Sequence, residues 1–86
     1  MKLTGPVVIG SNSTLHEDVI INDSVFWHNT VIGQRAVIKS SILADNCKIG
    51  DDCHLINAEL GDHATVSDGL KLKKDRRIMP SETIKE

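Results

Sequence analysis

Four histidines and two cysteines are the first side chains of this sequence to consider for acid–base, nucleophilic or metal-binding chemistry. A metal centre or a catalytic pair needs such groups to converge, usually from short and regular spacings. The histidines are unevenly spaced and fall at different positions of the repeat described below: His16, His28, His54 and His63. We therefore expect exposed polar turns there, and assign no catalytic, cofactor-binding or metal-ligating residue.

The elements that must position these side chains follow from a repeat of 17 residues. Sliding the sequence against itself aligns four segments without a gap, namely residues 9–25, 26–42, 43–59 and 60–76. Each segment carries three large apolar residues, called anchors here, at its positions one, seven and thirteen. In segment order the anchors are Ile9, Phe26, Leu43 and Leu60, then Leu15, Ile32, Ile49 and Val66, then Ile21, Ile38, Leu55 and Leu72.

Anchors spaced six, six and five residues apart fit neither an α-helix nor a long strand. They predict short strands separated by turns, with three strands making one triangular coil. Stacked coils would bury one aliphatic column per side and pair their backbones about 4.8 Å apart. Position four would be a corner with positive φ, which asparagine tolerates: Asn12, Asn29, Asn46 and His63. The fold class is therefore all-β, a single-stranded parallel β-helix of about four 17-residue triangular coils.

The repeat also divides the chain into three parts. Residues 1–8 are expected to form a partial N-terminal coil, with Thr4 and Val7 at inward positions. Residues 9–76 are the β-helix of hexapeptide-like units. Residues 77–86 are expected to break the repeat and form a C-terminal cap and tail, because an open end would expose apolar side chains and unpaired backbone.

The two cysteines fall in inward columns of the predicted coil, one uniformly small and the other small in its middle two segments. Cys47 and Cys53 follow different anchors, so they should face the interior from different sides. That placement makes a disulfide between them unfavourable, since bridging needs Cα atoms within about 7 Å. We expect two free buried thiols that act as small apolar fillers.

An interface is expected around four residues: Trp27, His28, Val7 and Ile9. Phe26 takes the anchor position, so the adjacent Trp27 must point outward, where it could contact a partner subunit or another domain or lie over neighbouring coils. The N-terminal end should present apolar side chains with an unpaired strand edge, namely Val7, Ile9, Leu15 and Ile21. Self-association is the simplest way to cover these groups, and we expect a homo-oligomer.

Composition narrows the range of partners. The net charge is −2, and 26% of residues are charged with mixed sign, so no strong attraction to nucleic acid or a membrane surface is expected. No apolar run approaches the roughly 18–20 residues of a membrane span, and the N-terminus lacks the apolar core of a signal peptide. The basic run at residues 71–77 is expected to be a solvated last coil. These features favour a cytoplasmic protein.

The repeat units resemble a known family. IGSNST, IGQRAV, LADNCK, IGDDCH and LGDHAT resemble the hexapeptide repeat of left-handed parallel β-helix proteins, and the left hand is implied by that resemblance. The runs DSVFWHNTVIG and SSILADNCKIGDDC and the closing RIMP are similar to the C-terminal domain of sugar-phosphate nucleotidyltransferases, of the mannose-1-phosphate guanylyltransferase and ADP-glucose pyrophosphorylase type.

The resemblance implies a function for a larger protein. In that family the chemistry lies in an N-terminal domain with a glycine-rich GGxGTR-like loop, whereas the six glycines here are scattered. This chain alone is therefore expected to be a non-catalytic oligomerisation or regulatory module, with the catalytic domain absent from it. The parent enzyme would join a nucleotide to a sugar 1-phosphate. The alternative is a small trimeric hexapeptide-repeat acyltransferase, which would use a histidine between subunits as general base.

Overall fold

The computed structural model describes residues 2–72 and 76–85, so residues 73–75 of the basic run lie outside it. The described residues form short strands that stack into three parallel sheets of five strands each. Sheet A contains β1 (Lys2–Thr4), β4 (Ile20–Asn22), β7 (Val37–Lys39), β10 (His54–Ile56) and β13 (Lys71–Leu72). Sheet B contains β2 (Val8–Ile9), β5 (Val25–Phe26), β8 (Ile42–Leu43), β11 (Ala58–Leu60) and β14 (Arg76–Ile78). Sheet C contains β3 (Thr14–Leu15), β6 (Val31–Ile32), β9 (Lys48–Ile49), β12 (Thr65–Val66) and β15 (Thr83–Ile84).

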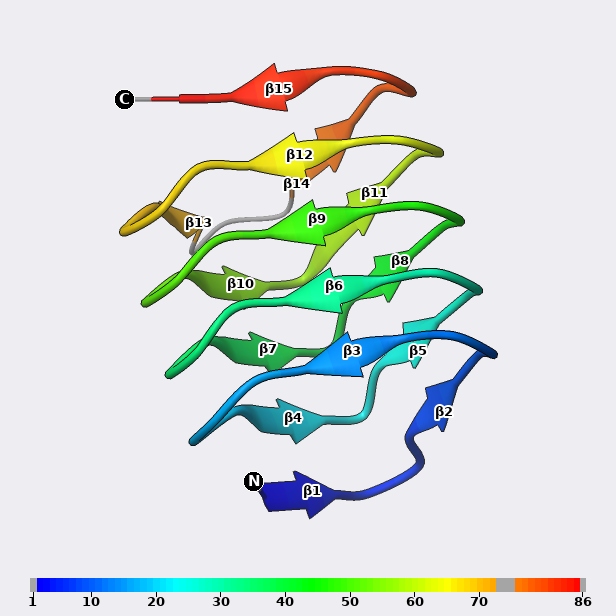
Figure 1. Cartoon of the computed structure of the whole chain (residues 1–86), viewed down its shortest axis with the longest axis vertical. Helices are drawn as coiled ribbons and strands as arrows, with labels where there is room; N and C mark the ends of the chain where they lie inside the picture. Colours follow the sequence, from blue (N-terminus) through cyan, green and yellow to red (C-terminus); the bar gives the residue numbers. More distant parts are fainter. Residues whose placement is uncertain (1, 73–75, 86) are drawn as a thin grey trace.

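The three sheets are the sides of a left-handed β-helix (Figure 1). Sheet C lies in front and its strands run from right to left, while the strands of sheet A lie behind and run from left to right. The chain rises from the N-terminus as it turns, so the coil is left-handed. The all-β, parallel β-helical prediction is confirmed, although the stack holds five strands per sheet where about four coils were expected.

Strand register confirms the 17-residue period through the middle of the chain. Val8 pairs with Val25 and Val25 with Ile42, and all three sheets keep this offset through their central strands. The first strand departs from it: Leu3, and not Thr4, lies beside the anchor Ile21, an offset of 18. The prediction that Thr4 points inward is therefore wrong, because the turn after β1 holds one residue more than the turns above it.

The C-terminal segment continues the repeat, contrary to the expectation that it would break there. Leu60 pairs with Ile78, and Val66 pairs with Ile84, each with an offset of 18. Both isoleucines are buried in the same core as the anchors below them. The sequence between β13 and β14 contains one residue more than the 17-residue repeat would give, and this shifts the register. The β-helix then continues with two further strands.

The core is the stack of anchors inside the three sheets. Its largest fully buried side chains include Phe26, Ile21, Ile32, Ile38 and Leu55. Small residues fill the positions between anchors, and the buried hydroxyls hydrogen-bond to neighbouring backbone: Ser24 donates to Asn22 O at 2.8 Å and Ser41 to Lys39 O at 2.9 Å. No buried side-chain nitrogen or oxygen in the described part of the chain lacks a partner. The close packing that a small aliphatic core requires is thus achieved without a polar defect.

The corners explain the repeat's polar positions. Positive φ recurs at the predicted position four and at two other corner columns: Asn12, Asn29, Asn46, His63 and Ser81; Asp18, Arg35, Asp52 and Gly69; and Gly5, Asp23, Ser40 and Asn57. Asparagine, aspartate and glycine tolerate this left-handed backbone region best. The asparagine column was therefore predicted correctly, and its residues set the sharp turns that make the coil triangular.

Candidate interaction surface

The three outer faces of the prism differ in chemistry. The outward residues of sheet C are mostly polar, namely Thr14, Val31, Lys48, Thr65 and Thr83. On sheet A the first and the last outward residues are lysines, and the full column is Lys2, Ile20, Val37, His54 and Lys71. Sheet B instead begins with three consecutive apolar residues, Val8, Val25 and Ile42. Val8 is 57% exposed and Ile42 49% exposed. We call Val8, Val25, Ile42 and the adjacent Trp27 the sheet B patch.

Trp27 lies at the corner where sheet B passes into sheet C. Its side chain is 55% exposed, as the sequence predicted from the inward position of Phe26. It lines a shallow depression together with Val8, Gly10, Val25, Phe26 and His28. Large exposed apolar side chains that adjoin one another are typical of a contact surface, whereas single ones are not informative.

The outward residues of the last two strands of sheet B are charged, so the apolar patch ends before them. Above Ile42 the outward residues are Glu59 and Arg77, which form an exposed ion pair with 3.5 Å between Arg77 Nε and Glu59 Oε2. Met79, 60% exposed, follows at the same corner as Trp27. The apolar character of sheet B is therefore concentrated in its first three strands.

Val7 and Ile9, the other residues of the expected interface, occupy a different place. Both are half-buried and pack against the core at the N-terminal end, so they face the interior of the coil. Ile21 does not belong to this exposed end, because Leu3 of β1 pairs beside it and leaves it fully buried. Strand β1 thus covers one side of the N-terminal end, and β2 and β3 remain the outermost described strands of the other two sheets.

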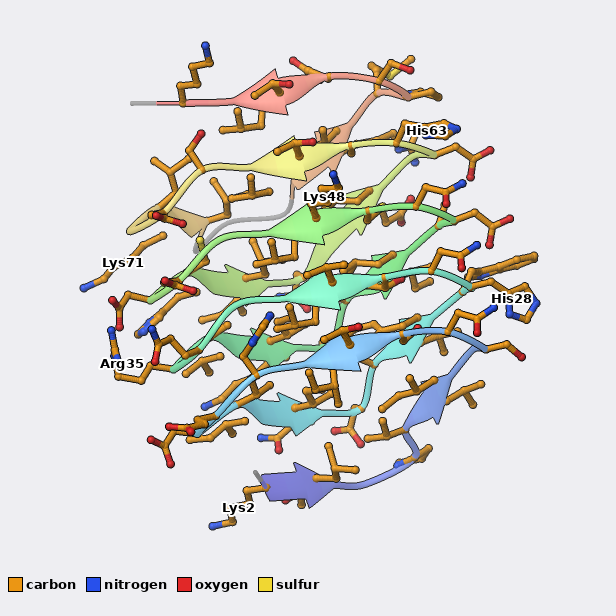
Figure 2. The ribbon with its side chains drawn as sticks, in the orientation of Figure 1. Lys2, His28, Arg35, Lys48, His63 and Lys71 are labelled. Carbon is orange, nitrogen blue, oxygen red and sulfur yellow. The ribbon has the colours of Figure 1, made fainter. Side chains whose placement is uncertain are left out.

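His28 follows Trp27 in the sequence, and its exposed side chain projects from the edge of the coil (Figure 2). Its ring takes part in a regular hydrogen-bond pattern. The backbone N–H of Ser11 donates to His28 Nδ1 at 2.8 Å. The backbone N–H of His28 in turn donates to Asp45 Oδ1 at 2.9 Å, and that of Asp45 donates to Asp62 Oδ1 at 3.2 Å. In the second, third and fourth segments, the side chain at position three therefore accepts a hydrogen bond from a backbone N–H of the segment before it.

The remaining histidines do not converge with His28. His16 follows β3, His54 is an outward residue of β10, and His63 lies in the turn after β11. Within residues 2–72 and 76–85, no group of three or more histidine, cysteine or acidic side chains could hold a metal ion. The same residues include no helix long and apolar enough to cross a membrane.

The cysteines are buried and free, as predicted. Cys47 Sγ donates to Gly61 O at 3.2 Å, and Cys53 Sγ donates to Ser67 O at 3.0 Å. Burial raises the pKa of both thiols above the usual value. Each therefore stays protonated at neutral pH and fills the interior as a small apolar group with a weak donor.

At the corner between sheets C and A lies an exposed ion pair with two parallel hydrogen bonds. Arg35 and Asp52 share a corner column, and Arg35 Nε and Nη2 donate to the two Asp52 oxygens at 2.7 and 3.0 Å. This hydrogen bonding holds the pKa of the Asp52 carboxyl below its usual value. Asp18 occupies the same column one coil below. The pair links two adjacent coils at a solvent-exposed corner.

A comparison with protein families matches the whole chain, residues 1–86, to the family described as the GMPPB C-terminal domain. The chain belongs to this family. The predicted kinship with the C-terminal β-helix of nucleotidyltransferases is thereby confirmed. In the GMPPB C-terminal domain seen here, most of the exposed large apolar residues lie on sheet B or at the corner after it, Leu3 and Ile20 lie on sheet A, and the histidines are dispersed over corners and faces.

The other comparisons give less information about this GMPPB C-terminal domain. The chain is similar to the crystal structure of serine acetyltransferase 1 from Entamoeba histolytica in complex with L-cysteine, with 16% identity and a TM-score of 0.47. The similarity covers 91% of this chain and 39% of that one, so the present chain spans well under half of its length. No curated protein matches the chain.

The interface expected from the sequence named Trp27 and His28 but not the apolar residues beside them. Val8, Val25 and Ile42 stand at the position before the first anchor in successive segments, and the 17-residue alignment already places them in one column. Three apolar residues at an outward position of consecutive coils are the signal that could have identified the patch in this GMPPB C-terminal domain.

Proposed function

We propose that this chain is a non-catalytic assembly module of a cytoplasmic sugar-1-phosphate nucleotidyltransferase, and that it associates with a second copy of itself through the sheet B patch. The parent enzyme would make a nucleotide sugar from a nucleoside triphosphate and a sugar 1-phosphate in a separate domain. Membership of the GMPPB C-terminal domain family supports the link to a nucleotidyltransferase. The continuous apolar run of Val8, Val25 and Ile42 beside Trp27 is the observation that carries the assembly role.

The patch suits a second copy of the chain because it is complementary to itself. Val25 lies between Val8 and Ile42 in the register of sheet B. In a two-fold arrangement centred on Val25, Val8 of each copy would meet Ile42 of the other, and the two Trp27 side chains would cover the edge. Such isologous contacts are the commonest in homo-oligomers. Glu59 and Arg77 would lie at the rim, where charge remains solvated.

The size of the face sets the expected strength. The Cα atoms span 26 × 22 × 21 Å, so one side of the prism is small compared with the roughly 800 Å² per partner of a standard interface. Three strands of one sheet would bury only part of that area. We therefore expect a reversible dimer in the micromolar range, about −7 to −8 kcal/mol at most.

The proposed absence of catalysis rests on the dispersal of the histidines. A general base must lie within hydrogen-bond reach of its substrate, and catalytic groups act in sets. His16, His54 and His63 come from different coils, and His28 Nδ1 is engaged by the Ser11 backbone. No observation favours the acyltransferase alternative over the assembly role.

Sedimentation equilibrium of the 86-residue chain between about 10 and about 300 μM tests this proposal, a range that spans weak association. The average mass should rise above the 9.4 kDa of the monomer as concentration increases. Trp27→Ser should return the mass to that of the monomer, whereas Ile20→Ser, which removes an exposed apolar residue of sheet A, should not. Trp27 is the only tryptophan, so its emission should also shift to the blue on association.

A 9.4 kDa monomer at every concentration would contradict the proposal. Association that survives Trp27→Ser but is lost with Ile20→Ser would move the interface to sheet A. Both results are informative because the two substitutions are at exposed positions, where changes to folding stability are expected to be small.

A further inference from the structure

Asp23 borders the sheet B patch on the side opposite to Trp27. It precedes Val25 by two residues, at the corner where sheet A passes into sheet B, and its side chain is exposed. The described residues with positive φ in this corner column are Gly5, Asp23, Ser40 and Asn57. Asp23 is the charged member among them, and it lies in the coil at the centre of the patch.

The Asp23 carboxylate lies at the outer rim of this corner. The backbone N–H of Asp23 donates to Thr4 O at 3.0 Å, which joins the corner to the coil below. A Cβ on Gly5 would overlap the carboxylate, so the carboxylate occupies the space beside that glycine. Because it is exposed at the rim, it can interact with a charge on a neighbouring molecule.

Among the side chains that the structure describes, no basic one forms an ion pair with Asp23. Of the two ion pairs found there, one is at the corner between sheets C and A and the other is on the last two strands of sheet B. Lys39 lies beside Asn22 in the strand register, on the outer side of sheet A, and is in neither of them. Asp23 therefore brings an unpaired negative charge to the edge of the patch.

The proposed two-fold contact places the coil of β5 opposite its own counterpart. In a face-to-face contact, Val8 faces Ile42 of the other copy where the axis runs along β5 through Val25. Asp23 lies along this axis before Val25 and Trp27 lies after it, so each faces its own counterpart in the other copy. Sheets packed face to face are about 10 Å apart, and the two Asp23 carboxylates would come to roughly that separation.

Two like charges at this separation oppose association. With a dielectric constant between those of water and of a protein surface, repulsion at about 10 Å raises a dissociation constant by about threefold. The screening length is about 30 Å at about 0.01 M salt and about 3 Å at about 1 M, so the repulsion acts at the lower concentration and is lost at the higher one. A charge at the rim of a contact thereby governs its salt dependence.

We propose that Asp23 limits self-association through the sheet B patch, because it repels its own counterpart across the two-fold axis, and that salt strengthens the contact by screening this repulsion. The inference rests on the proposed function, since it requires the contact centred on Val25. The apolar side chains supply the attraction, and Asp23 sets how much of it is offset at a given salt concentration.

A reversed charge tests directly whether Asp23 faces itself. Two Asp23→Lys chains would repel one another as two wild-type chains do, but a wild-type chain and an Asp23→Lys chain would attract one another. Sedimentation velocity of a fluorescent trace of wild type, with unlabelled wild type or Asp23→Lys in excess, gives the two dissociation constants. At about 0.01 M sodium chloride the mixed pair should bind about ninefold more tightly than the wild-type pair, since a threefold repulsion becomes a threefold attraction. At about 1 M the two should agree.

Asp18→Lys is the matched control. It makes the same change in net charge, and Asp18 also has a positive φ, but it lies at the corner between sheets C and A, away from the patch. Arg35 occupies the same corner column with a φ of 60°, so a long basic side chain fits such a position. The dissociation constant of Asp18→Lys with the wild type reports the effect of net charge alone and should stay close to that of the wild-type pair.

Asp23→Asn provides a second test, which introduces no lysine. Asn57 occupies the same corner two coils above with a φ of 55°, so the fold should accept asparagine. Asp23→Asn should associate about threefold more tightly than the wild type at about 0.01 M salt and equally at about 1 M. Equal dissociation constants of Asp23→Lys and Asp18→Lys with the wild type, or no change in Asp23→Asn, would overturn the inference and leave the proposed function standing. A monomer in every mixture would overturn both.

Discussion

Replacing Ile32 by aspartate is the most direct test of the inward register. Ile32 is the second anchor of its segment, lies in β6 and is fully buried. The neighbouring strands place Leu15 on one side of it and Ile49 on the other. Ile32→Asp would put a carboxyl group into this aliphatic column, where no described side chain is positioned to pair with a charge.

The expected loss is large compared with the total stability. Removing a buried isoleucine side chain costs about 2–5 kcal/mol, before any charge is considered. An unpaired carboxylate adds several kcal/mol more unless it takes up a proton, and protonation itself costs about 1.4 kcal/mol for each unit by which pH exceeds the ordinary pKa. At about 0.05–0.15 kcal/mol per residue, a chain of 86 residues has roughly 4–13 kcal/mol to lose. Ile32→Asp should therefore be largely unfolded at neutral pH.

Urea denaturation followed by circular dichroism measures this effect. Ile32→Val should lower the free energy of unfolding by about 0.5–1.5 kcal/mol, which gives a graded reference at the same position. Thr14→Asp places the same carboxylate on the outer face of the adjacent strand and should change stability by no more than about 0.5 kcal/mol. The loss in Ile32→Asp should shrink as pH falls, because burial favours the protonated acid. A wild-type urea midpoint for Ile32→Asp would refute the inward placement of this column.

Three further predictions concern the corners and the thiols. Gly33→Ala should cost about 1–3 kcal/mol in urea denaturation, because its Cβ would lie 2.6 Å from backbone of the next coil, and an unchanged midpoint would contradict the stacking of that corner. Cys47 and Cys53 should react with a thiol reagent far more slowly in the native chain than in urea, since burial raises both pKa values; equal rates would refute their inward placement. Arg35 lowers the pKa of Asp52, so the pair stabilises the fold at neutral pH and this contribution is lost as pH falls through the acid range below about 4. Asp52→Asn should accordingly show a shallower acid destabilisation than the wild type, and identical acid unfolding would argue against the pair.

The inward columns and one of the corner columns could be predicted from sequence because their constraints repeat with every coil. Each anchor stacks on the anchor below, so a residue such as Ile32 must be large and apolar, whereas Cys47 lies in a column of small buried residues with Thr30 and Ala64. The asparagine corner repeats for an equally local reason, since its backbone needs positive φ. A requirement for residue size or backbone conformation that recurs in every coil gives a residue pattern with the same period, and a single sequence is enough to reveal it.

The two ends were mispredicted because each contains one residue more than the repeat. At the N-terminal end Leu3 pairs beside Ile21 and Val8 beside Val25, so the turn between β1 and β2 holds one residue more than the turn between β4 and β5. At the other end, Ile78 and Ile84 are six residues apart, the spacing of consecutive anchors. That spacing indicates that the coils continue, but a 17-residue repeat aligned without gaps does not include it.

Outward positions follow different rules, and the proposed contact at the sheet B patch rests on them. A residue on the outer face has no neighbour that fixes its size, so stacking alone does not make it apolar. Val8, Val25 and Ile42 are apolar in succession, and the same column then changes to Glu59 and Arg77. The change falls between the third and fourth strands of sheet B. A partner that covered the entire face would have to desolvate the Glu59–Arg77 pair, at a cost that an exposed pair of this kind does not repay. The proposed contact is therefore confined to the N-terminal three strands, beside the corner where Trp27 and His28 lie.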